Sequence, residues 1–268
     1  MCTRDCWHCP AVQRGHKLNT MDQPLYDKIV KELHDLKWNG VVQWFFVNEP
    51  LLDKQWEARI TQLRREVPRC TIHVTSNWDT QYKREREVQL DTVLRLFAAG
   101  VNSLNINDYD VRGTGLWLPK MVRDALPAVT MGAHNWQPLG PRHHHFSVME
   151  GHPVKLHSWS GYNKSTMNGK GKCARPHRHL TIGWDGSVYL CCAVNPTTAT
   201  VFGNLHTQSM VEVWNGRKFF EYRWHLQQGI RQGDCNGCVV PVAYPRELRH
   251  VSIPEWELPL LSAKEVTT

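Results

Sequence analysis

The cysteines of this 268-residue chain fall into two groups whose spacing suits metal binding. Three of the nine stand within the first nine residues, and five lie toward the other end: Cys173, Cys191, Cys192, Cys235 and Cys238. An odd number in this grouping does not match the disulfide framework of a secreted protein. Because the chain shows no export signal, grouped thiols are more often metal ligands, so we predict two metal sites.

The first group, Cys2, Cys6 and Cys9, offers three thiolates rather than four. A short loop can wrap three thiolates around one corner of a cubane iron–sulfur cluster and leave the fourth iron without a protein ligand. A closed zinc site needs four ligands, and His8 or His16 could complete one. The triplet by itself leaves both interpretations open.

The second group offers four ligands: Cys173, one of Cys191 and Cys192, Cys235 and Cys238. Four thiolates close a coordination sphere, so this site should be structural or electron-transferring, with zinc as the competing metal. Adjacent strand residues point to opposite faces, so only one of Cys191 and Cys192 is expected to reach the metal. The remaining cysteine, Cys70, stands alone before a strand and is expected to be a small buried residue.

Helices and strands alternate in the pattern from about residue 20 to 130. An apolar stripe from Leu25 to Leu36 predicts a helix that Thr20 can cap and that ends before Gly40. The apolar run 41–47 predicts a strand buried on both faces. Helices are also expected at about 54–66, 90–100 (with Gly100 as its stop) and 118–126, and strands at 70–75, 101–107, 128–131 and 144–150. This alternation predicts an α/β fold with a parallel sheet or barrel.

Near residue 160 the character of the sequence changes to a Gly-, Ser- and Asn-rich linker. The stretch 179–192 predicts a β-hairpin around Asp185-Gly186, and a helical segment follows at 209–228. We therefore divide the chain into a core at 1–160, a cysteine-bearing domain at 161–245 and a tail at 246–268.

Composition and charge exclude several classes of protein. Hydrophobic residues are 41% and charged residues 21%, which argues against disorder, and no apolar run is long enough to span a membrane. The net charge of +7 is spread along the chain, and the densest basic stretch, 81–89, also contains two Glu residues. Charge-driven nucleic-acid binding is therefore disfavoured, and a cytoplasmic protein is predicted.

The first 110 residues resemble the radical S-adenosylmethionine (radical SAM) enzymes. The Cys-x3-Cys-x2-Cys signature stands at 2–9, and three strand-end motifs of the family follow in order as FFVNEPLLD, IHVTSN and AAGVNSLNIND. The resemblance implies a partial (β/α) barrel in which a 4Fe–4S cluster and SAM generate a 5′-deoxyadenosyl radical that abstracts a substrate hydrogen. A barrel strand normally precedes the cysteine loop, and here only Met1 does. A truncated start and a barrel without its first strand are both open.

The resemblance also implies roles for individual residues. Cys2, Cys6 and Cys9 would ligate the catalytic cluster, and the His8 backbone would meet the adenine. The polar residues that follow the strands would face the methionyl amino group, carboxylate or ribose of SAM: Asn48, Glu49, Ser76, Asn77, Asn105 and Asn107. The alternative for each Asn is a turn or strand-end cap. Val47-Asn48 replaces the usual Gly-Gly pair, and Trp78 stands where Gly is common.

The C-terminal part resembles the SPASM extension of these enzymes, or its shorter relative called twitch. The matching runs are CARPHRHLTIGWDGSVYLCCAVN, VFGNLHTQSMVEVWN and CNGC. Five cysteines are too few for the two auxiliary clusters of a full SPASM domain, so one auxiliary 4Fe–4S cluster is implied. Size and cysteine spacing also resemble the aminocyclitol dehydrogenases of this family, which favours Cys191 over Cys192 as the ligand.

The function implied is an oxidoreductase that removes hydrogen from a small sugar-like alcohol, with the auxiliary cluster accepting one electron. The alternatives are a radical SAM peptide- or protein-modifying maturase and a zinc-binding nucleic-acid module. The expected partners are a small-molecule or peptide substrate and an electron donor such as flavodoxin or ferredoxin. No proton acceptor can be named, although several candidates stand near a late strand: Arg142, His143, His145 and Glu150.

Overall fold

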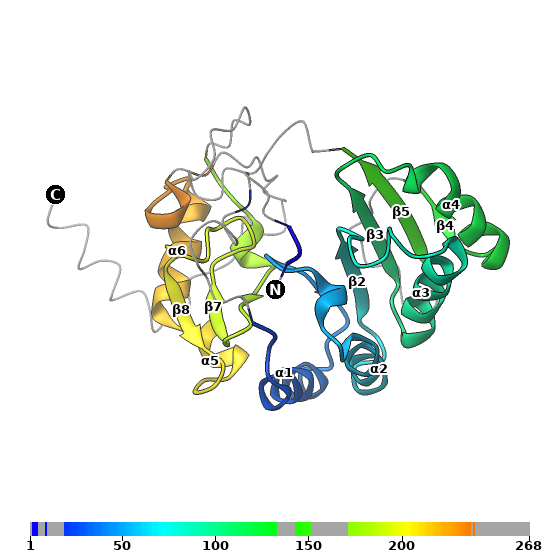
Figure 1. Ribbon diagram of the computed structural model, residues 1–268. Helices are drawn as coiled ribbons and strands as arrows, with labels where there is room; N and C mark the ends of the chain where they lie inside the picture. Colours follow the sequence, from blue (N-terminus) through cyan, green and yellow to red (C-terminus); the bar gives the residue numbers. More distant parts are fainter. Residues whose placement is uncertain are drawn as a thin grey trace, which may run out of the picture.

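The computed structural model describes residues 2–4, 9, 19–132, 143–151, 171–236 and 238. Within them, a five-stranded parallel sheet with helices precedes a smaller part built on a three-stranded antiparallel sheet (Figure 1). The predicted linker near residue 160 and the tail from 246 lie outside the described residues, so the three domain limits stay predictions. Among the described helices, none combines the length and the apolar character that crossing a membrane requires.

The larger sheet has the strand order β1-β2-β3-β5-β4, and all neighbouring strands run parallel. Its strands are β1 (Val41–Gln43), β2 (Thr71–Ser76), β3 (Ser103–Asp108), β4 (Thr130–Met131) and β5 (His145–Glu150). This sheet confirms the predicted α/β fold with a partial barrel. At one edge β5 lies between β3 and β4, which departs from the sequential strand order of a simple β/α barrel.

The two faces of this sheet differ in character because successive strand residues point to opposite sides. One face buries its side chains against the helices α1 (Gln23–Asp35), α2 (Trp56–Glu66), α3 (Arg86–Ala99) and α4 (Thr114–Ala125). Its central residues have no exposed surface: Ile72, Val74, Leu104, Ile106 and Phe146. The other face carries a row of His73, Ser103 and His145 and a second row of Thr75, Asn105 and Ser147. The apolar core therefore lies on the helix side, and the other side carries polar residues that are themselves mostly buried.

The helix ends follow from local hydrogen bonds. The Asp22 side chain accepts a hydrogen bond of 2.8 Å from the Leu25 backbone N–H and caps α1, with Pro24 in the first turn. The prediction of Thr20 as the cap was therefore wrong by two residues. Asp is an efficient N-cap, and Pro is favoured directly after one. Helix α3 ends at Gly100 with a φ of +118°, as predicted for a left-handed C-terminal residue.

The first strand is shorter than predicted. The apolar run 41–47 forms strand only over Val41–Gln43, and its residues are half-buried rather than buried on both faces. Trp44 still donates a backbone hydrogen bond to the His73 carbonyl, at 2.8 Å. Beyond it, the Asn48 side chain accepts the Phe46 N–H at 2.8 Å, which turns the chain away from the sheet. A polar turn residue thus ends a strand that hydrophobicity alone would extend.

The smaller part confirms the predicted hairpin. Strands β6 (Thr181–Ile182) and β7 (Ser187–Tyr189) pair antiparallel, and β8 (Val201–Asn204) pairs with β7. Between β6 and β7, Gly186 has a φ of +77°, and the Asp185 side chain accepts the Ser187 N–H at 3.1 Å. Asp-Gly therefore supplies the turn chemistry that the sequence indicated.

The predicted helix at 209–228 is instead two helices, α5 (Met210–Trp214) and α6 (Arg217–Gln228). The break falls at Asn215 and Gly216, where Gly216 adopts an extended backbone before α6. Glycine is a poor helix former, so the chain turns here at low cost. Short 3-10 turns complete the fold at Pro50–Leu52, Arg175–His177 and Gly233–Cys235.

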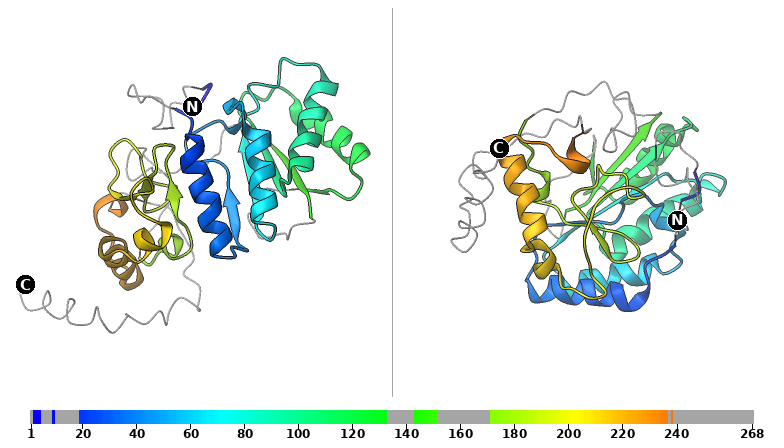
Figure 2. Two further views of the ribbon diagram at one scale, coloured as in Figure 1. Left: turned by 90° about the horizontal axis from the view of Figure 1, so that it is seen from below. Right: turned by 90° about the vertical axis from the view of Figure 1, so that its left-hand side faces the viewer.

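Helix α1 joins the two parts (Figure 2). Its Val30 packs in the core of the large sheet, whereas its Leu25 packs in the core of the smaller part. Lys28 donates hydrogen bonds to the backbone carbonyls of residues 205 and 208, and Glu32 accepts the Met210 N–H at 2.6 Å. The smaller part is thus held on α1 by both apolar and polar contacts.

Candidate active site and metal centres

The carboxyl edge of the large sheet brings together several predicted site residues. Asn77, directly after β2, donates from its side-chain amide to the Cys2 sulfur at 3.5 Å and to the Thr3 hydroxyl at 3.2 Å. The start of the chain therefore lies on the strand ends, although the two segments are far apart in the sequence. Cys9 is half-buried, whereas Cys6 and His8 lie outside the described residues.

Glu49 is the buried acid of this edge and is 2% exposed. Its carboxylate accepts three hydrogen bonds, from the Ser76 hydroxyl at 2.8 Å, the Asn77 N–H at 2.7 Å and the Leu51 N–H at 3.0 Å. Burial raises the pKa of Glu49 to about 7 despite these donors. The site therefore holds a carboxyl group that can change its protonation near neutral pH.

Asn48 does not join this group through any contact in the described residues. Its side chain is exposed, and its oxygen is used by the Phe46 N–H. The structure thus gives Asn48 the turn-capping contact that sequence reasoning kept as the alternative to SAM binding.

Trp78 explains how the chain tolerates a departure from the family pattern. It has a φ of +61°, the left-handed region in which glycine is at ease, at the position where Gly is common in the family. Such a conformation costs a bulky residue roughly 1–2 kcal/mol. The ring is 1% exposed, and its Nε1–H donates to Gln89 at 2.8 Å. Burial of this large aromatic side chain offsets the backbone strain.

An ion-pair network, which we call the loop clamp (Arg4, Asp79, Asp110 and Arg112), fixes the cysteine loop to the strand ends. Arg4 binds Asp79 through Nε at 2.9 Å and Asp110 through Nη1 at 3.1 Å. Arg112 binds the other Asp79 oxygen at 2.7 Å and also pairs with Asp110. Sequence reasoning missed this network, and its only signal was an Arg between Cys2 and Cys6.

A polar chain runs along β3 toward the clamp. The Ser147 hydroxyl donates to Asn105 at 2.8 Å, and the Asn105 amide donates to Asn107 at 2.8 Å. Asn107 in turn donates to the Tyr109 hydroxyl at 3.1 Å, and the Arg4 guanidinium lies 5.4 Å from the Tyr109 ring centroid. The predicted residues Asn105 and Asn107 therefore bind each other, and their side chains form one line of hydrogen bonds from Ser147 to Tyr109.

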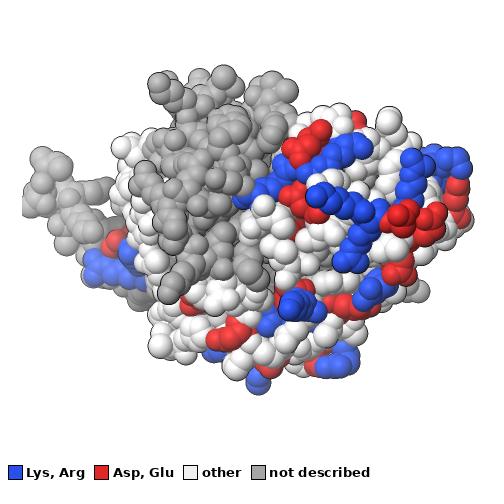
Figure 3. All heavy atoms as spheres, viewed as in Figure 1, with Lys and Arg blue, Asp and Glu red and all other residues white. Residues whose placement is uncertain are grey.

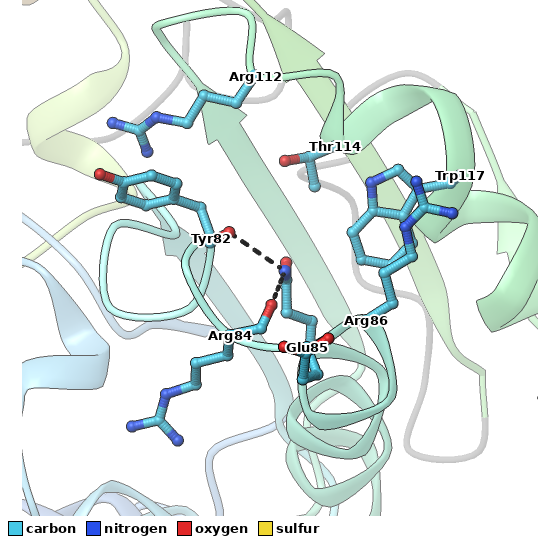
Figure 4. Close-up of a pocket in the computed structure, with 8 residues that line it drawn as sticks. Tyr82, Arg84, Glu85, Arg86, Arg112, Thr114 and Trp117 are labelled. Carbon is cyan, nitrogen blue, oxygen red and sulfur yellow. Dashed lines mark hydrogen bonds between the residues drawn. The ribbon is translucent and has the colours of Figure 1, made fainter.

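A small cavity of about 230 Å³ lies beside the clamp (Figure 4). Arg112 stacks over the Tyr82 ring at 3.7 Å, and Gln89 donates to the backbone carbonyls of Tyr82 and Arg84. None of the predicted site residues lines this cavity. On the part of the face in Figure 3 that is not grey, basic and acidic side chains are interspersed.

The remaining proton-acceptor candidates separate along β5. His145 is the first residue of this strand and is buried, whereas Glu150 is its last residue. His143 is exposed, and Arg142 lies outside the described residues. Of the three candidates that the structure describes, Glu150 alone stands at the carboxyl end of the strand. Away from the site, Cys70 is fully buried in the core of the large sheet, as predicted.

The four cysteines of the second group share one region of the smaller part. Cys173 packs against the apolar cluster that contains Cys235, and Cys238 packs against the smaller cluster that contains the buried Cys191. Burial raises the pKa of Cys235 to about 12, and the neighbouring Cys238 and Cys173 add to the shift. The pKa of Cys191 is also raised by burial, with Cys192 and Cys235 contributing. Thiols that perturb one another in this way lie close together.

The geometry distinguishes Cys191 from Cys192. Cys191 is 8% exposed, and its sulfur accepts the Ala193 N–H at 3.4 Å. Cys192 is half-buried, and its sulfur lies 3.5 Å from Arg175 Nη1. Cys235 contributes to the raised pKa of Cys191, so these two thiols lie near each other. This proximity favours Cys191 as the fourth ligand.

The donor set fits iron–sulfur clusters in chemistry, although the described residues contain no group of three or more ligands already at metal-binding geometry. No disulfide joins the described cysteines. At the second group, Arg231 Nη2 is a buried donor without a hydrogen-bond partner in the described residues. An unpartnered N–H close to Cys173 and Cys235 suits a group that carries sulfur acceptors. At the first group, the Asn77 amide already donates to the Cys2 sulfur.

Comparisons with known proteins agree with this arrangement. Residues 173–239 match the SPASM family, an iron–sulfur cluster-binding domain. This match confirms the predicted SPASM-type part of the chain. Together with the similarities described next, it agrees with the resemblance to radical SAM enzymes and with SAM and two 4Fe–4S clusters as cofactors. They give no support to the zinc-binding module.

The proteins similar to this chain include a SAM-dependent dehydrogenase. The chain is 25% identical over 240 residues to the S-adenosyl-L-methionine-dependent 2-deoxy-scyllo-inosamine dehydrogenase of Niallia circulans, covering 88% of each protein. Its fold is similar to that of BtrN in complex with AdoMet and 2-DOIA, with a TM-score of 0.67, 22% identity and coverage of 89% and 88%. It is also similar to selenomethionine BtrN in an open conformation, with a TM-score of 0.63, 19% identity and coverage of 94% of both chains.

Proposed function

We propose that the chain is a radical SAM dehydrogenase that oxidises one hydroxyl group of a small, polyhydroxylated cyclic molecule. The observation that carries this proposal is the pairing of two cysteine sites. Cys2, from the three-cysteine motif, lies at the carboxyl edge of a partial barrel, and four other cysteines gather in the SPASM-type part. The dehydrogenase from Niallia circulans, similar over 88% of its length, supports the same reaction class.

Cys2, Cys6 and Cys9 would hold the catalytic cluster, with His8, Asn48, Glu49, Ser76, Asn77, Asn105 and Asn107 as the candidate SAM contacts. When bound, the cluster and SAM supply a 5′-deoxyadenosyl radical able to remove a hydrogen atom from a C–H bond. Asn77 stabilises the thiolate of Cys2 through its amide N–H, and Glu49 fixes the turn after β2 through Ser76. A buried carboxyl of this kind can accept a hydrogen bond from an ammonium group.

Cys173, Cys191, Cys235 and Cys238 would hold the auxiliary cluster, which would supply a one-electron acceptor when bound. Removal of a hydrogen atom, a proton and an electron together converts an alcohol to a ketone. A site closed by four thiolates suits electron transfer because it leaves no open metal position.

The polar face of the sheet supports a sugar-like substrate over a peptide. Its two rows present hydroxyl, amide and imidazole groups, including Thr75, Asn105, Ser147 and His73. Such groups match the hydroxyls of a polyol, which a largely apolar face would reject. An external one-electron donor such as flavodoxin or ferredoxin is part of this proposal.

Anaerobic reconstitution with iron and sulfide tests it. We expect roughly eight irons per chain, from two four-iron clusters. With a reductant, SAM and 2-deoxy-scyllo-inosamine as probe, we expect 5′-deoxyadenosine and a ketone product by mass spectrometry. Cys2→Ala should abolish 5′-deoxyadenosine, whereas Cys70→Ala, in the core, serves as the matched control. Bound zinc without visible absorption, or clusters that never yield 5′-deoxyadenosine, would contradict the proposal.

A further inference from the structure

Arg231, which follows α6, is a half-buried cation beside the second cysteine group. Its Nε donates to the Gly171 carbonyl at 3.0 Å, and its Nη1 donates to the Cys238 carbonyl at 3.0 Å. These two bonds fix the plane of the guanidinium. The third nitrogen, Nη2, is buried and has no hydrogen-bond partner within the part of the chain that the structure describes. A buried guanidinium N–H without an acceptor is costly, so an acceptor other than the described residues is indicated.

The surroundings of Arg231 identify that acceptor. Its positive charge lowers the pKa values of Cys173 and Cys235, which burial raises. Together with the bond to the Cys238 carbonyl, this places the guanidinium beside three of the four proposed ligands. Arg175 is a second cation near these thiols: its Nη1 lies 3.5 Å from the Cys192 sulfur, and its charge lowers the pKa of Cys173, which burial raises. Sulfur atoms carrying negative charge are therefore the acceptors that a cluster would bring next to Nη2.

A hydrogen bond from Arg231 would affect the reduction potential of the auxiliary cluster, because the cluster becomes more negative when it is reduced. An oxidised 4Fe–4S core held by four thiolates carries a net charge of about −2, which becomes about −3 after one electron is added. A neighbouring positive charge and a hydrogen bond to sulfur stabilise the more negative form more strongly. Both therefore raise the reduction potential of the cluster.

We infer that Arg231 is a positioning residue that donates a hydrogen bond from Nη2 to a sulfur of the auxiliary cluster and raises its reduction potential. This inference rests on the proposed function. In that reaction, the alcohol loses a hydrogen atom to the 5′-deoxyadenosyl radical, a proton to solvent and an electron to the auxiliary cluster, leaving a ketone. Arg231 favours the last transfer because it stabilises the reduced cluster.

The test measures the midpoint potential of the auxiliary cluster in the full chain, with Cys2, Cys6 and Cys9 changed to Ala so that only this cluster is present. Arg231→Met should make the potential more negative by 59 mV or more, a tenfold change in the one-electron reduction equilibrium. Arg217→Met is the matched control, because it removes the same charge from an exposed position on α6. It should leave the potential unchanged.

A second measurement covers the case in which Arg231→Met does not retain iron. Pulsed EPR of the reduced cluster in protein labelled with ¹⁵N-arginine should show nitrogen coupling that persists in Arg175→Met and disappears in Arg231→Lys. Equal potentials for Arg231→Met and Arg217→Met, or no arginine coupling, would overturn the role of Arg231 while leaving the proposed function intact. If the chain with only Cys2, Cys6 and Cys9 changed to Ala binds no auxiliary cluster, both the role of Arg231 and the proposed function are overturned.

Discussion

The loop clamp should control how often the cysteine loop leaves the strand ends. In Asp79→Asn, the side chain keeps its size but loses the charge that binds Arg4 at 2.9 Å and Arg112 at 2.7 Å. The Arg4 and Asp79 side chains are only 13% and 11% exposed, so solvent replaces these contacts poorly. Hydrogen bonds to charged groups contribute about 1.5–3 kcal/mol each. Because Asp110 still pairs with both arginines, we expect a net loss of about 2 kcal/mol in the closed state.

Alkylation of Cys2 in the metal-free, reduced protein measures this loss directly. Where reaction follows local opening, about 2 kcal/mol corresponds to roughly 30-fold faster modification of Cys2 by iodoacetamide. Glu57→Gln is the control, since its pair with Arg95 is about half exposed on both sides and surface pairs contribute about 0–1 kcal/mol. If Asp79→Asn alkylates Cys2 no faster than Glu57→Gln does, the clamp does not hold the loop.

Three other predictions address the site and its support. Cys191→Ser should lose the auxiliary cluster, about four irons per chain, whereas Cys192→Ser should keep it; equal iron contents would refute the choice of Cys191. The raised pKa of Glu49 means that the folded metal-free protein binds more protons than the unfolded chain between pH 4.5, its ordinary value, and about 7. Stability should therefore fall as pH rises through this window, by up to about 1.4 kcal/mol per pH unit, and urea unfolding of Glu49→Gln should lack that slope. Trp78→Gly should relieve the positive φ but lose a buried ring, for a net destabilisation of about 2–4 kcal/mol by chemical denaturation; a stabilised variant would show that strain dominates at this position.

The parallel sheet was predictable because its signal is local and strong. Alternating runs such as Thr71–Ser76, in which Ile72 and Val74 point to one side, and helices such as the one ending at Gly100 need no knowledge of distant residues. The errors in element limits also have local causes. Asn48 ends the first strand through its own side chain, and Gly216 divides a helix that hydrophobic spacing alone continues.

The site was predictable only where a motif marked it. The cysteine spacing and the strand-end residues Glu49, Ser76 and Asn77 follow from such patterns, and the structure joins these three by hydrogen bonds. The clamp was not predictable, because Arg4 meets its partners across 75 and 106 residues of sequence. Arg231 was missed for a similar reason. Its role is indicated by a buried N–H without an acceptor in the described residues, and a sequence does not show this.

Helix α1 sets a limit on how this molecule can be divided or recombined. Leu25 belongs to one core and Val30 to the other, so a single helix is the shared wall of both. A truncation before residue 171 would leave the Leu25 side of α1 and the Glu32 carboxylate without their partners, and an apolar surface of that kind promotes aggregation. Conversely, the smaller part transplanted alone would lack a wall of its own core. The cluster-binding part thus depends on the first helix of the barrel for its core. An exchange of this part between relatives would have to include that helix.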